Sequence, residues 1–337
     1  MDSLTHTVLG ACLGEVVAGK KLGKKAMLIG ALVNNLPDID MVANFWSSPA
    51  QGLLTHRGIT HSILFAVVMT PLLILLFKKT LKEDPLSFTR WLVLVGHGLF
   101  LHILMDAFTT YGTGWFEPFD HTRVSFNTLF ILDPFFMVPL LIAFIFLLLL
   151  KNEKHKTRAW FAGTGLSVSA LYLLATFGIK LNVNRIIEKE ILRNGFVATD
   201  YMGSPTPLNT ILWYAIVKEE KGFRIGYYSI LDKTNTITFE MMDKNDSLLT
   251  PYKKSDDVHR LIRFSQDYYC VKETEEGIMF SDIRFGQLGI SAKGKPSFVF
   301  NFDVIPKLDQ SIDVKQSKFK TANSQDLKAL YNRIKGI

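Results

Sequence analysis

The sequence predicts an α-helical membrane bundle of about six segments, the first two irregular, followed by a C-terminal β-rich extramembrane domain. The chain has 337 residues, of which 48% are hydrophobic, and its mean hydropathy is +0.19. A positive mean hydropathy at this length indicates that one part of the chain lies in lipid. The composition excludes intrinsic disorder and disulfide-rich secreted scaffolds. Cys12 and Cys270 lie in unlike surroundings, so we expect no disulfide between them.

Apolar runs before residue 180 predict the membrane bundle. Four of them match the roughly 20 residues that a helix needs to cross the hydrocarbon core, namely His61–Phe77, Trp91–Thr110, Phe130–Leu150 and Ala159–Ile179. Two weaker runs, Leu4–Gly19 and Ala26–Asn44, precede them and contain Gly, Asn and Asp. We expect these two to be interior helices, the second broken at Pro37. Residues 1–180 are therefore predicted to form the membrane domain.

Residues 181–337 have a different residue pattern, which predicts a β-rich extracytoplasmic domain. Short aromatic and β-branched segments alternate there with Asp, Asn, Gly and Lys clusters, as is typical of strands and turns. The predicted strands are Phe223–Leu231, Thr236–Met241, Leu261–Phe264, Gly277–Phe285 and Ser297–Phe302, and a helix is expected at Ser324–Ile334.

The basic residues between the apolar runs predict the orientation of the bundle. Three alternate connections carry twelve of them, whereas the other two connections carry only Arg57 and Arg123. Because cytoplasmic loops are enriched in Lys and Arg, the three basic connections are predicted to be cytoplasmic. The C-terminal domain then faces outward. The twelve are Lys20, Lys21, Lys24, Lys25, Lys78, Lys79, Lys82, Arg90, Lys151, Lys154, Lys156 and Arg158.

Ionisable residues inside or beside these apolar runs indicate a functional site, because such groups are expensive in a membrane. His102 and Asp106 are four residues apart, so a helix places them on one face. Imidazole and carboxylate together suit zinc, iron or manganese. We predict seven metal ligands: His6, Asp38, Asp40, His56, His61, His102 and Asp106.

A depth estimate brings six of these ligands together. Counted from the nearest cytoplasmic basic residue at about 1.5 Å per residue, they all lie roughly 18–26 Å above it, in the outer half of the bilayer. His56 is left out because it lies in a connection. Glu15 and His97 come out lower and are not assigned to the site: Glu15 is expected to extend toward the cytoplasmic face. Gly10 and Gly14 predict close helix packing.

Five motifs occur along residues 1–140 in this order: MDSLTHTVLGACLG, NNLPDID, HRGITHS, HILMDAFTTYGTGWFEPF and FILDPFF. With these motifs, residues 1–140 resemble the bacterial membrane-bound metal-dependent hydrolases, the YdjM-like group. The resemblance implies a hydrolase of the bacterial cytoplasmic (inner) membrane. It also implies that the seven residues named above correspond to the family's histidines and aspartates. A looser similarity to zinc-dependent phospholipase C is an analogy that suggests a substrate class.

Seven ligands exceed what one zinc ion requires, so we predict two divalent ions, zinc favoured, with an aspartate bridging them. Asp38, Arg57 and Asp106 are the predicted catalytic residues, with Arg57 as the cation for a phosphate group. Thr5 and Thr60 are expected to hydrogen-bond to ligands. Because the site lies in the outer leaflet, the predicted substrate is a lipid phosphoester or a lipid-linked ester.

Two other functions agree with the same residues. Intramembrane His and Asp also form metal-ion or proton transport pathways. Alternatively, the metal stabilises a structural or sensory membrane protein whose β-rich domain binds a partner. Nucleic-acid binding is disfavoured, because the basic residues follow the topology rule rather than forming a patch. The sequence leaves the metal, the substrate and the oligomeric state open.

Overall fold

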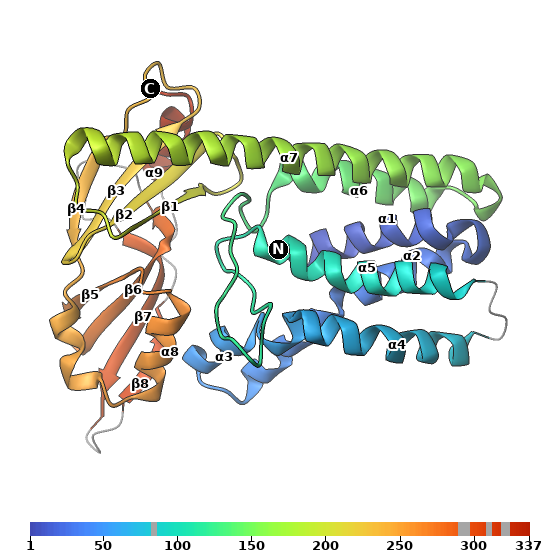
Figure 1. Ribbon diagram of the computed structural model, residues 1–337, viewed down its shortest axis with the longest axis horizontal. Coiled ribbons are helices and arrows are strands. Elements are labelled where there is room, and N and C mark those ends of the chain that lie inside the picture. The colour runs from blue at the N-terminus through green and yellow to red at the C-terminus, as the bar shows by residue number, and fades with distance from the viewer. Residues whose placement is uncertain (82–85, 289–296, 308–311, 318–323) are drawn as a thin grey trace. The chain divides into compact units, whose positions relative to one another are not determined.

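A computed structural model describes residues 1–81, 86–288, 297–307, 312–317 and 324–337 (Figure 1). Lys82 of the predicted topology lies outside these residues. The chain divides into two compact units. The helical unit contains Met1–Val42, Thr55–Phe177 and Pro207–Asn209, and the sheet unit contains Ala43–Leu54, Gly178–Thr206 and Thr210–Ile337.

The helical unit is a bundle whose helices lie alongside one another (Figure 1). Its α-helices are α1 (Ser3–Leu22), α2 (Lys24–Asn35), α4 (Ile63–Thr80), α5 (Phe88–Ala107), α6 (Pro134–Leu149) and the first part of α7 (His155–Asn194). Three short 3-10 helices connect them: η1 (Leu36–Phe45), which extends into the sheet unit, η2 (Ile59–His61) and η3 (Asn152–Lys154).

Local sequence signals set the ends of these helices. The side chains of Asp2, Ser62, Ser87 and Asp133 each accept a hydrogen bond from a backbone N–H in the first turn of the following helix. Such caps contribute about 1 kcal/mol each. Between α2 and η1, the α-helix gives way to 3-10 geometry just before Pro37, which lacks the N–H that an α-helix interior needs. The predicted break in the second segment is therefore confirmed.

Glycines bring α1 and α2 into close contact. A Cβ atom at Gly10 or Gly14 would collide with the backbone of α2 at Gly30 and Ala26. The prediction that Gly10 and Gly14 serve helix packing is thus confirmed. Around this contact, two buried clusters fill the bundle, one including Val8 and Leu140 and the other including Trp91 and Leu94.

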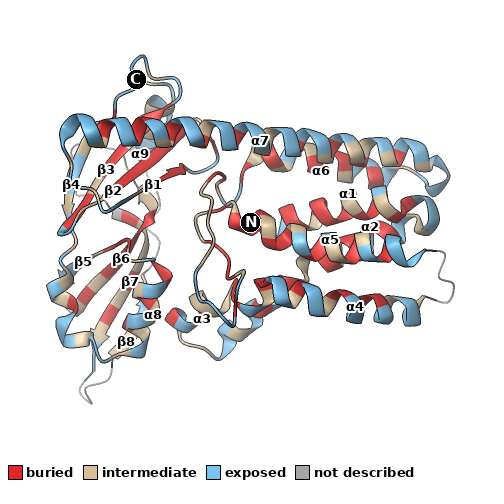
Figure 2. Ribbon diagram, in the orientation of Figure 1, coloured by how far each residue is buried: buried red, intermediate tan, exposed pale blue. Residues whose placement is uncertain are grey.

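Within the residues that the structure describes, four helical stretches are long and apolar enough to cross a membrane, judged by length and composition: Lys24–Phe45, Ile63–Thr80, Phe88–Ala107 and Asn152–Asn194. Helix α6 is also apolar but shorter. Figure 2 shows that α4 and α7 carry many exposed residues among the helices. On α4 these include the apolar side chains of Val67, Leu72 and Leu75. Such a surface is the one that a lipid-facing helix needs.

The described residues of the sheet unit form two four-stranded antiparallel sheets with strands in sequential order. The first consists of β1 (Asp200–Pro205), β2 (Leu212–Lys218), β3 (Gly222–Ser229) and β4 (Phe239–Asp243). The second consists of β5 (Tyr269–Thr274), β6 (Gly277–Leu288), β7 (Ser297–Pro306) and β8 (Ile312–Gln316). The helices α3 (Pro49–Thr55), α8 (Asp256–Phe264) and α9 (Ser324–Ile334) and the 3-10 helix η4 (Asp246–Tyr252) accompany the strands.

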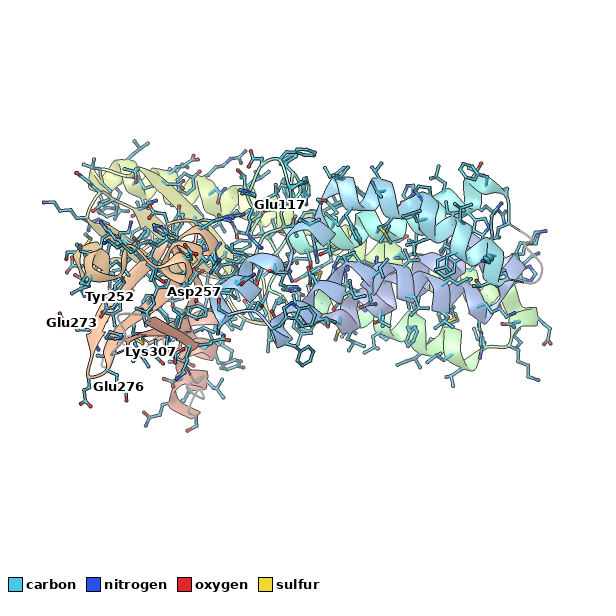
Figure 3. The ribbon with its side chains drawn as sticks, turned by 90° about the horizontal axis from the view of Figure 1, so that it is seen from below. Glu117, Tyr252, Asp257, Glu273, Glu276 and Lys307 are labelled. Carbon is cyan, nitrogen blue, oxygen red and sulfur yellow. The ribbon has the colours of Figure 1, made fainter. Side chains whose placement is uncertain are left out.

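Helices cover the two sheets. The last part of α7 packs Val183, Ile186 and Ile187 against Trp213 of β2. Near α3, Ser48 donates a hydrogen bond of 2.7 Å to Asp257 of α8, which is labelled in Figure 3. Asp267 accepts hydrogen bonds from two lysines of this unit, at 2.5 Å from Lys218 and 2.7 Å from Lys244.

The coarse prediction, apolar helices followed by antiparallel sheets, is confirmed, but several elements differ. The predicted strand Leu261–Phe264 is wrong, because these residues end α8, whose Val258, Leu261 and Phe264 share one buried face at helical spacing. Helix α7 continues past Ile179 to Asn194, because Val183, Ile186 and Ile187 repeat the same spacing. Strands β1, β2, β5 and β8 were not predicted. Helix α9 has the predicted bounds.

Candidate metal centre

The candidate site lies in the helical unit, where the ends of several helices meet. Asp38 and Asp40 are carried by η1, directly after α2, and His61 ends η2, just before α4. His102 and Asp106 lie one turn apart near the end of α5. Helix ends suit this purpose, because a side chain there can point into a polar space that the apolar helix bodies exclude.

Four of these residues form a compact group. One ligand atom from each of Asp38, His61, His102 and Asp106 lies within 4.8 Å of all the others. His61 Nε2 is 2.9 Å from His102 Nε2, 3.4 Å from Asp38 Oδ1 and 3.2 Å from Asp106 Oδ2. The side chains of both histidines and of Asp106 are fully buried, whereas that of Asp38 is 11% exposed.

The hydrogen bonds of the two histidines fix which nitrogen faces the group. His102 Nδ1 lies 2.5 Å from the backbone oxygen of Asn34, so Nδ1 carries the proton and donates it. His61 Nδ1 lies 3.0 Å from Thr60 Oγ1, which itself donates to Asp40, and 3.2 Å from Asp40 Oδ2, so this Nδ1 likewise carries the proton. The two Nε2 atoms therefore present lone pairs to each other and to two carboxylate oxygens. Four electron-pair donors converging in a buried space match the ligand set of a divalent cation.

Several nitrogen donors surround the carboxylate of Asp106. Its Oδ1 accepts from His6 Nε2 at 3.1 Å and contacts the α-amino group of Met1. Its Oδ2 lies 3.1 Å from Arg57 Nε but has no hydrogen bond of good geometry among the described residues. This oxygen, which lies near the Nε2 atoms of His61 and His102, is therefore available to bind a cation, which supports a cation site at the centre.

Arg57 is buried and directed at Asp106. Its guanidinium donates to Thr109 Oγ1 at 2.8 Å and to the backbone oxygen of Met1 at 3.3 Å, and it lies 4.8 Å from the ring centroid of Tyr111. Burial lowers the pKa of Arg57 to about 10, so it stays protonated at neutral pH. Arg57 is therefore a fixed positive charge beside Asp106, one of the candidate ligands.

A second group shares one residue with the first. Asp38, Asp40 and His56 also bring one ligand atom each within 4.8 Å of one another. His56 Nδ1 is 2.8 Å from Asp40 Oδ1, while Asp40 Oδ2 accepts from Thr60 Oγ1 at 2.5 Å and from the backbone N–H of Arg57 at 3.0 Å. Asp38 belongs to both groups, as an aspartate between two ions would.

All seven residues predicted from the sequence lie in the helical unit, and six belong to the two groups. His6 lies outside both, hydrogen-bonded to Asp106 and stacked on His102 with ring centroids 3.8 Å apart. Of the two predicted supporting threonines, Thr60 binds Asp40, whereas Thr5 binds Asp2 at the start of α1. Thr109, which accepts a hydrogen bond from Arg57, was not predicted as a supporting residue. Its position three residues after Asp106 could have indicated that it lies near the site.

Glu15 and His97 lie apart from the site. Glu15 is buried and forms an ion pair with Arg158, whose Nη2 is 2.5 Å from Glu15 Oε2. Glu15, expected to extend toward the cytoplasmic face, instead stays buried, because a cation from α7 meets its charge inside the bundle. Arg158, predicted in a cytoplasmic connection, is fully buried. His97 is exposed on α5.

Comparison with known proteins places this site in a family. The profile of the YdjM inner membrane proteins matches residues 1–182, more than half of the chain. The chain belongs to the YdjM inner membrane protein family. The matched region contains both groups, so the candidate centre lies in the part that defines this YdjM family member. Together with its apolar helices, this assigns the protein to the membrane.

Two relatives extend the comparison. The uncharacterized protein YfhP of Bacillus subtilis is 27% identical over 326 residues, covering 89% of this chain and 90% of YfhP. The inner membrane protein YbcI of Escherichia coli is 28% identical over 122 residues, covering 36% of this chain and 69% of YbcI. No solved structure gives a significant match. YfhP therefore resembles both the helical and the sheet-forming parts of this chain.

Proposed function

We propose that this protein is a membrane-embedded metal-dependent hydrolase that cleaves a lipid phosphoester or a lipid-linked ester at the outer leaflet. The observation that carries the proposal is the pair of His/Asp groups that share Asp38. Two ions held in this way, zinc favoured, would lower the pKa of a water molecule and neutralise charge on the oxygens of an ester undergoing attack. Asp38, Asp40, His56, His61, His102 and Asp106 would hold them.

The exposure of the ligands indicates where a substrate would enter. Among the six, the side chains of His56 and Asp38 are the most exposed, at 18% and 11%. An ester group would therefore approach the ions beside these two residues. Arg123, whose Nη2 donates to the backbone oxygen of His56 at 2.9 Å, brings a second cation to this entrance.

The remaining residues would keep the ligands charged and oriented. Arg57 holds a positive charge 3.1 Å from Asp106, which favours the carboxylate form that binds a cation. In this proposal Arg57 acts through Asp106, since its Nη1 and Nη2 already donate to Thr109 and to the backbone oxygen of Met1 and its Nε lies 3.1 Å from Asp106 Oδ2. Asp40 orients His61 in the same way.

The basic residues support an orientation for the enzyme. Lysines between α1 and α2 and at the end of α4 mark a cytoplasmic side, and the candidate centre lies at the opposite ends of α2, α4 and α5. In this proposal the helices cross the inner membrane several times. The centre and the sheet unit then face the extracytoplasmic side, where lipids of the outer leaflet are the available esters.

One competing function has support from the site itself. Full burial of His61, His102 and Asp106 is also what a purely structural metal site would show. Transport has less support, because Glu15, the acidic group nearer the cytoplasmic end, is neutralised by Arg158. Hydrolytic turnover distinguishes the proposed hydrolase from a structural metal site, since a structural site binds metal without turnover.

The test begins with the metal content of detergent-purified protein. We expect about two equivalents of zinc or manganese in the parent and their loss in the His102→Ala/Asp106→Ala variant. Asp120→Asn, on an exposed loop, is the control and should retain the metal. The parent should then release the headgroup from phosphatidylglycerol or a related lipid in mixed micelles. A parent that binds no metal would refute the proposal, and metal binding without turnover across a lipid panel would favour a structural role.

A further inference from the structure

An apolar groove lies between α4 and α5, which are neighbours in the helical unit (Figure 1). Its volume is about 390 Å³, within the range of sites that hold small molecules. Small residues and a helix-breaking residue create the space, because Ala66, Pro71 and Gly96 leave little side chain between the helices. Both helices are long and apolar enough to span a membrane, so in the proposed membrane orientation this groove faces hydrocarbon.

The groove runs from the level of the candidate metal centre toward the cytoplasmic ends of the helices. On α4 it begins at Ile63, two residues after His61, and on α5 it begins at Phe100, two residues before His102. It extends to Pro71 on α4 and to Leu92, eight residues from Phe100, on α5. Because the two helices are antiparallel, both edges have the same length, roughly 12 Å.

The chemistry of the lining selects the occupant. Thr70 is one of two polar side chains that line the groove, and its hydroxyl already donates to the backbone oxygen of Ala66 at 2.6 Å. The other is His97, toward the middle of the α5 edge. A headgroup or peptide would leave most of its polar atoms unpaired here, whereas a hydrocarbon chain has none to satisfy.

We propose that this groove binds one acyl chain of the lipid substrate and thereby positions its ester group at the metal centre. The inference rests on the proposed hydrolase function and narrows its substrate to esters that carry at least one long acyl chain. The chain would lie between α4 and α5 with its polar end at Ile63 and Phe100. Binding energy from this remote, unreactive part of the substrate would serve to orient the reacting bond.

Gly96 allows the groove to be filled selectively. A Cβ atom at Gly96 would meet Thr70 Cγ2 at 3.6 Å and Leu92 Cδ1 at 3.9 Å, which are ordinary contacts, so Gly96→Ala fits. Gly96→Phe would instead project a ring into the groove. Leu75→Phe adds a ring to α4 at a position that is 65% exposed and does not line the groove, so it is the matched control.

The experiment uses the full chain in a sterol-based detergent that has no acyl chain of its own, with a trace of phosphatidylglycerol that carries a diazirine in its acyl chain. After irradiation, mass spectrometry locates the labelled residues. We expect labelling at Val67 and Phe100 that excess unlabelled phosphatidylglycerol suppresses. It should fall about tenfold in Gly96→Phe, the effect of losing roughly two buried methylene groups, and persist in Gly96→Ala and Leu75→Phe.

The outcomes separate this inference from the proposed function. Uniform labelling of all lipid-facing helices that excess lipid does not suppress would overturn the acyl-chain site even if Gly96→Phe fails to fold. Full labelling in a folded Gly96→Phe variant would overturn it as well. Saturable groove labelling in a parent that binds no metal would support a lipid site and refute the hydrolase. Metal binding with uniform labelling would refute only the groove.

Discussion

Asp40 offers the sharpest test of how the candidate centre is built, because it serves both groups. Its Oδ1 lies 2.8 Å from His56 Nδ1, and its Oδ2 accepts from Thr60 and from a backbone N–H and lies 3.2 Å from His61 Nδ1. Asp40→Asn preserves the shape of the side chain but turns one of these acceptors into a donor. At least one partner of the carboxylate then faces an N–H group, and His61 loses the charge that fixes its tautomer.

The expected loss follows from this geometry. Removing a carboxylate that orients a ligating histidine costs about 10–100-fold in metal affinity, which corresponds to about 1.4–2.7 kcal/mol. The second group loses a ligand altogether, so the number of bound ions should fall from about two to about one. Competition with a zinc-chelating dye in detergent measures the affinity, and elemental analysis measures the number of ions.

The matched control is Asp120→Asn, the same chemical change on an exposed loop. It should bind metal as the parent does. If Asp40→Asn binds two ions with the affinity of the parent, the role assigned to the Asp40 carboxylate is incorrect. An equal loss in both variants would show that the effect arises from net charge rather than from the contacts of Asp40.

Three further predictions concern packing, pH and reactivity. Gly14→Ala should lower the stability of the full chain in detergent by about 1–3 kcal/mol, measured by thermal unfolding, whereas Gly163→Ala, with no neighbour within 4 Å, should not. Partial burial of Asp267 is outweighed by its two lysine partners, which hold its pKa below the ordinary value. Its stabilisation, present at neutral pH, should therefore be lost as pH falls below about 4, and Asp267→Asn should weaken this acid dependence. Burial raises the pKa of the Cys270 thiol to about 12, so maleimide should label it at pH 8 only after unfolding, as peptide mass spectrometry can show.

The sequence predicted the bundle and its polar residues because both follow from local rules. An apolar run of about 20 residues has few alternatives to a membrane helix, and Pro37 forces a break wherever a helix contains it. The depth estimate brought His61, His102 and Asp38 together without contact information. These three residues lie close together in the structure because each lies beside a helix end on the same side of the bundle.

The elements that the sequence did not yield depend on tertiary partners. Leu261–Phe264 is apolar and short enough for a strand, and its helical face becomes evident only when Val258 is included. The burial of Glu15 depends on Arg158, which is 143 residues away in the chain. No local pattern links the two, so the charge of Glu15 alone suggested an exposed position.

The same distinction explains the division of roles within the candidate site. His61 and His102 could be recognised as ligand candidates because a histidine in an apolar run demands a reason. The groups that orient them could not: the partner of His102 is a backbone oxygen at Asn34, which the change from α to 3-10 geometry leaves available, and that of His61 is Asp40, itself a ligand candidate. Supporting contacts of this kind decide whether two imidazoles turn lone pairs or protons toward the centre. The position of a candidate metal site can therefore be predicted from residue types and spacing, whereas the orientation of its ligands requires the fold.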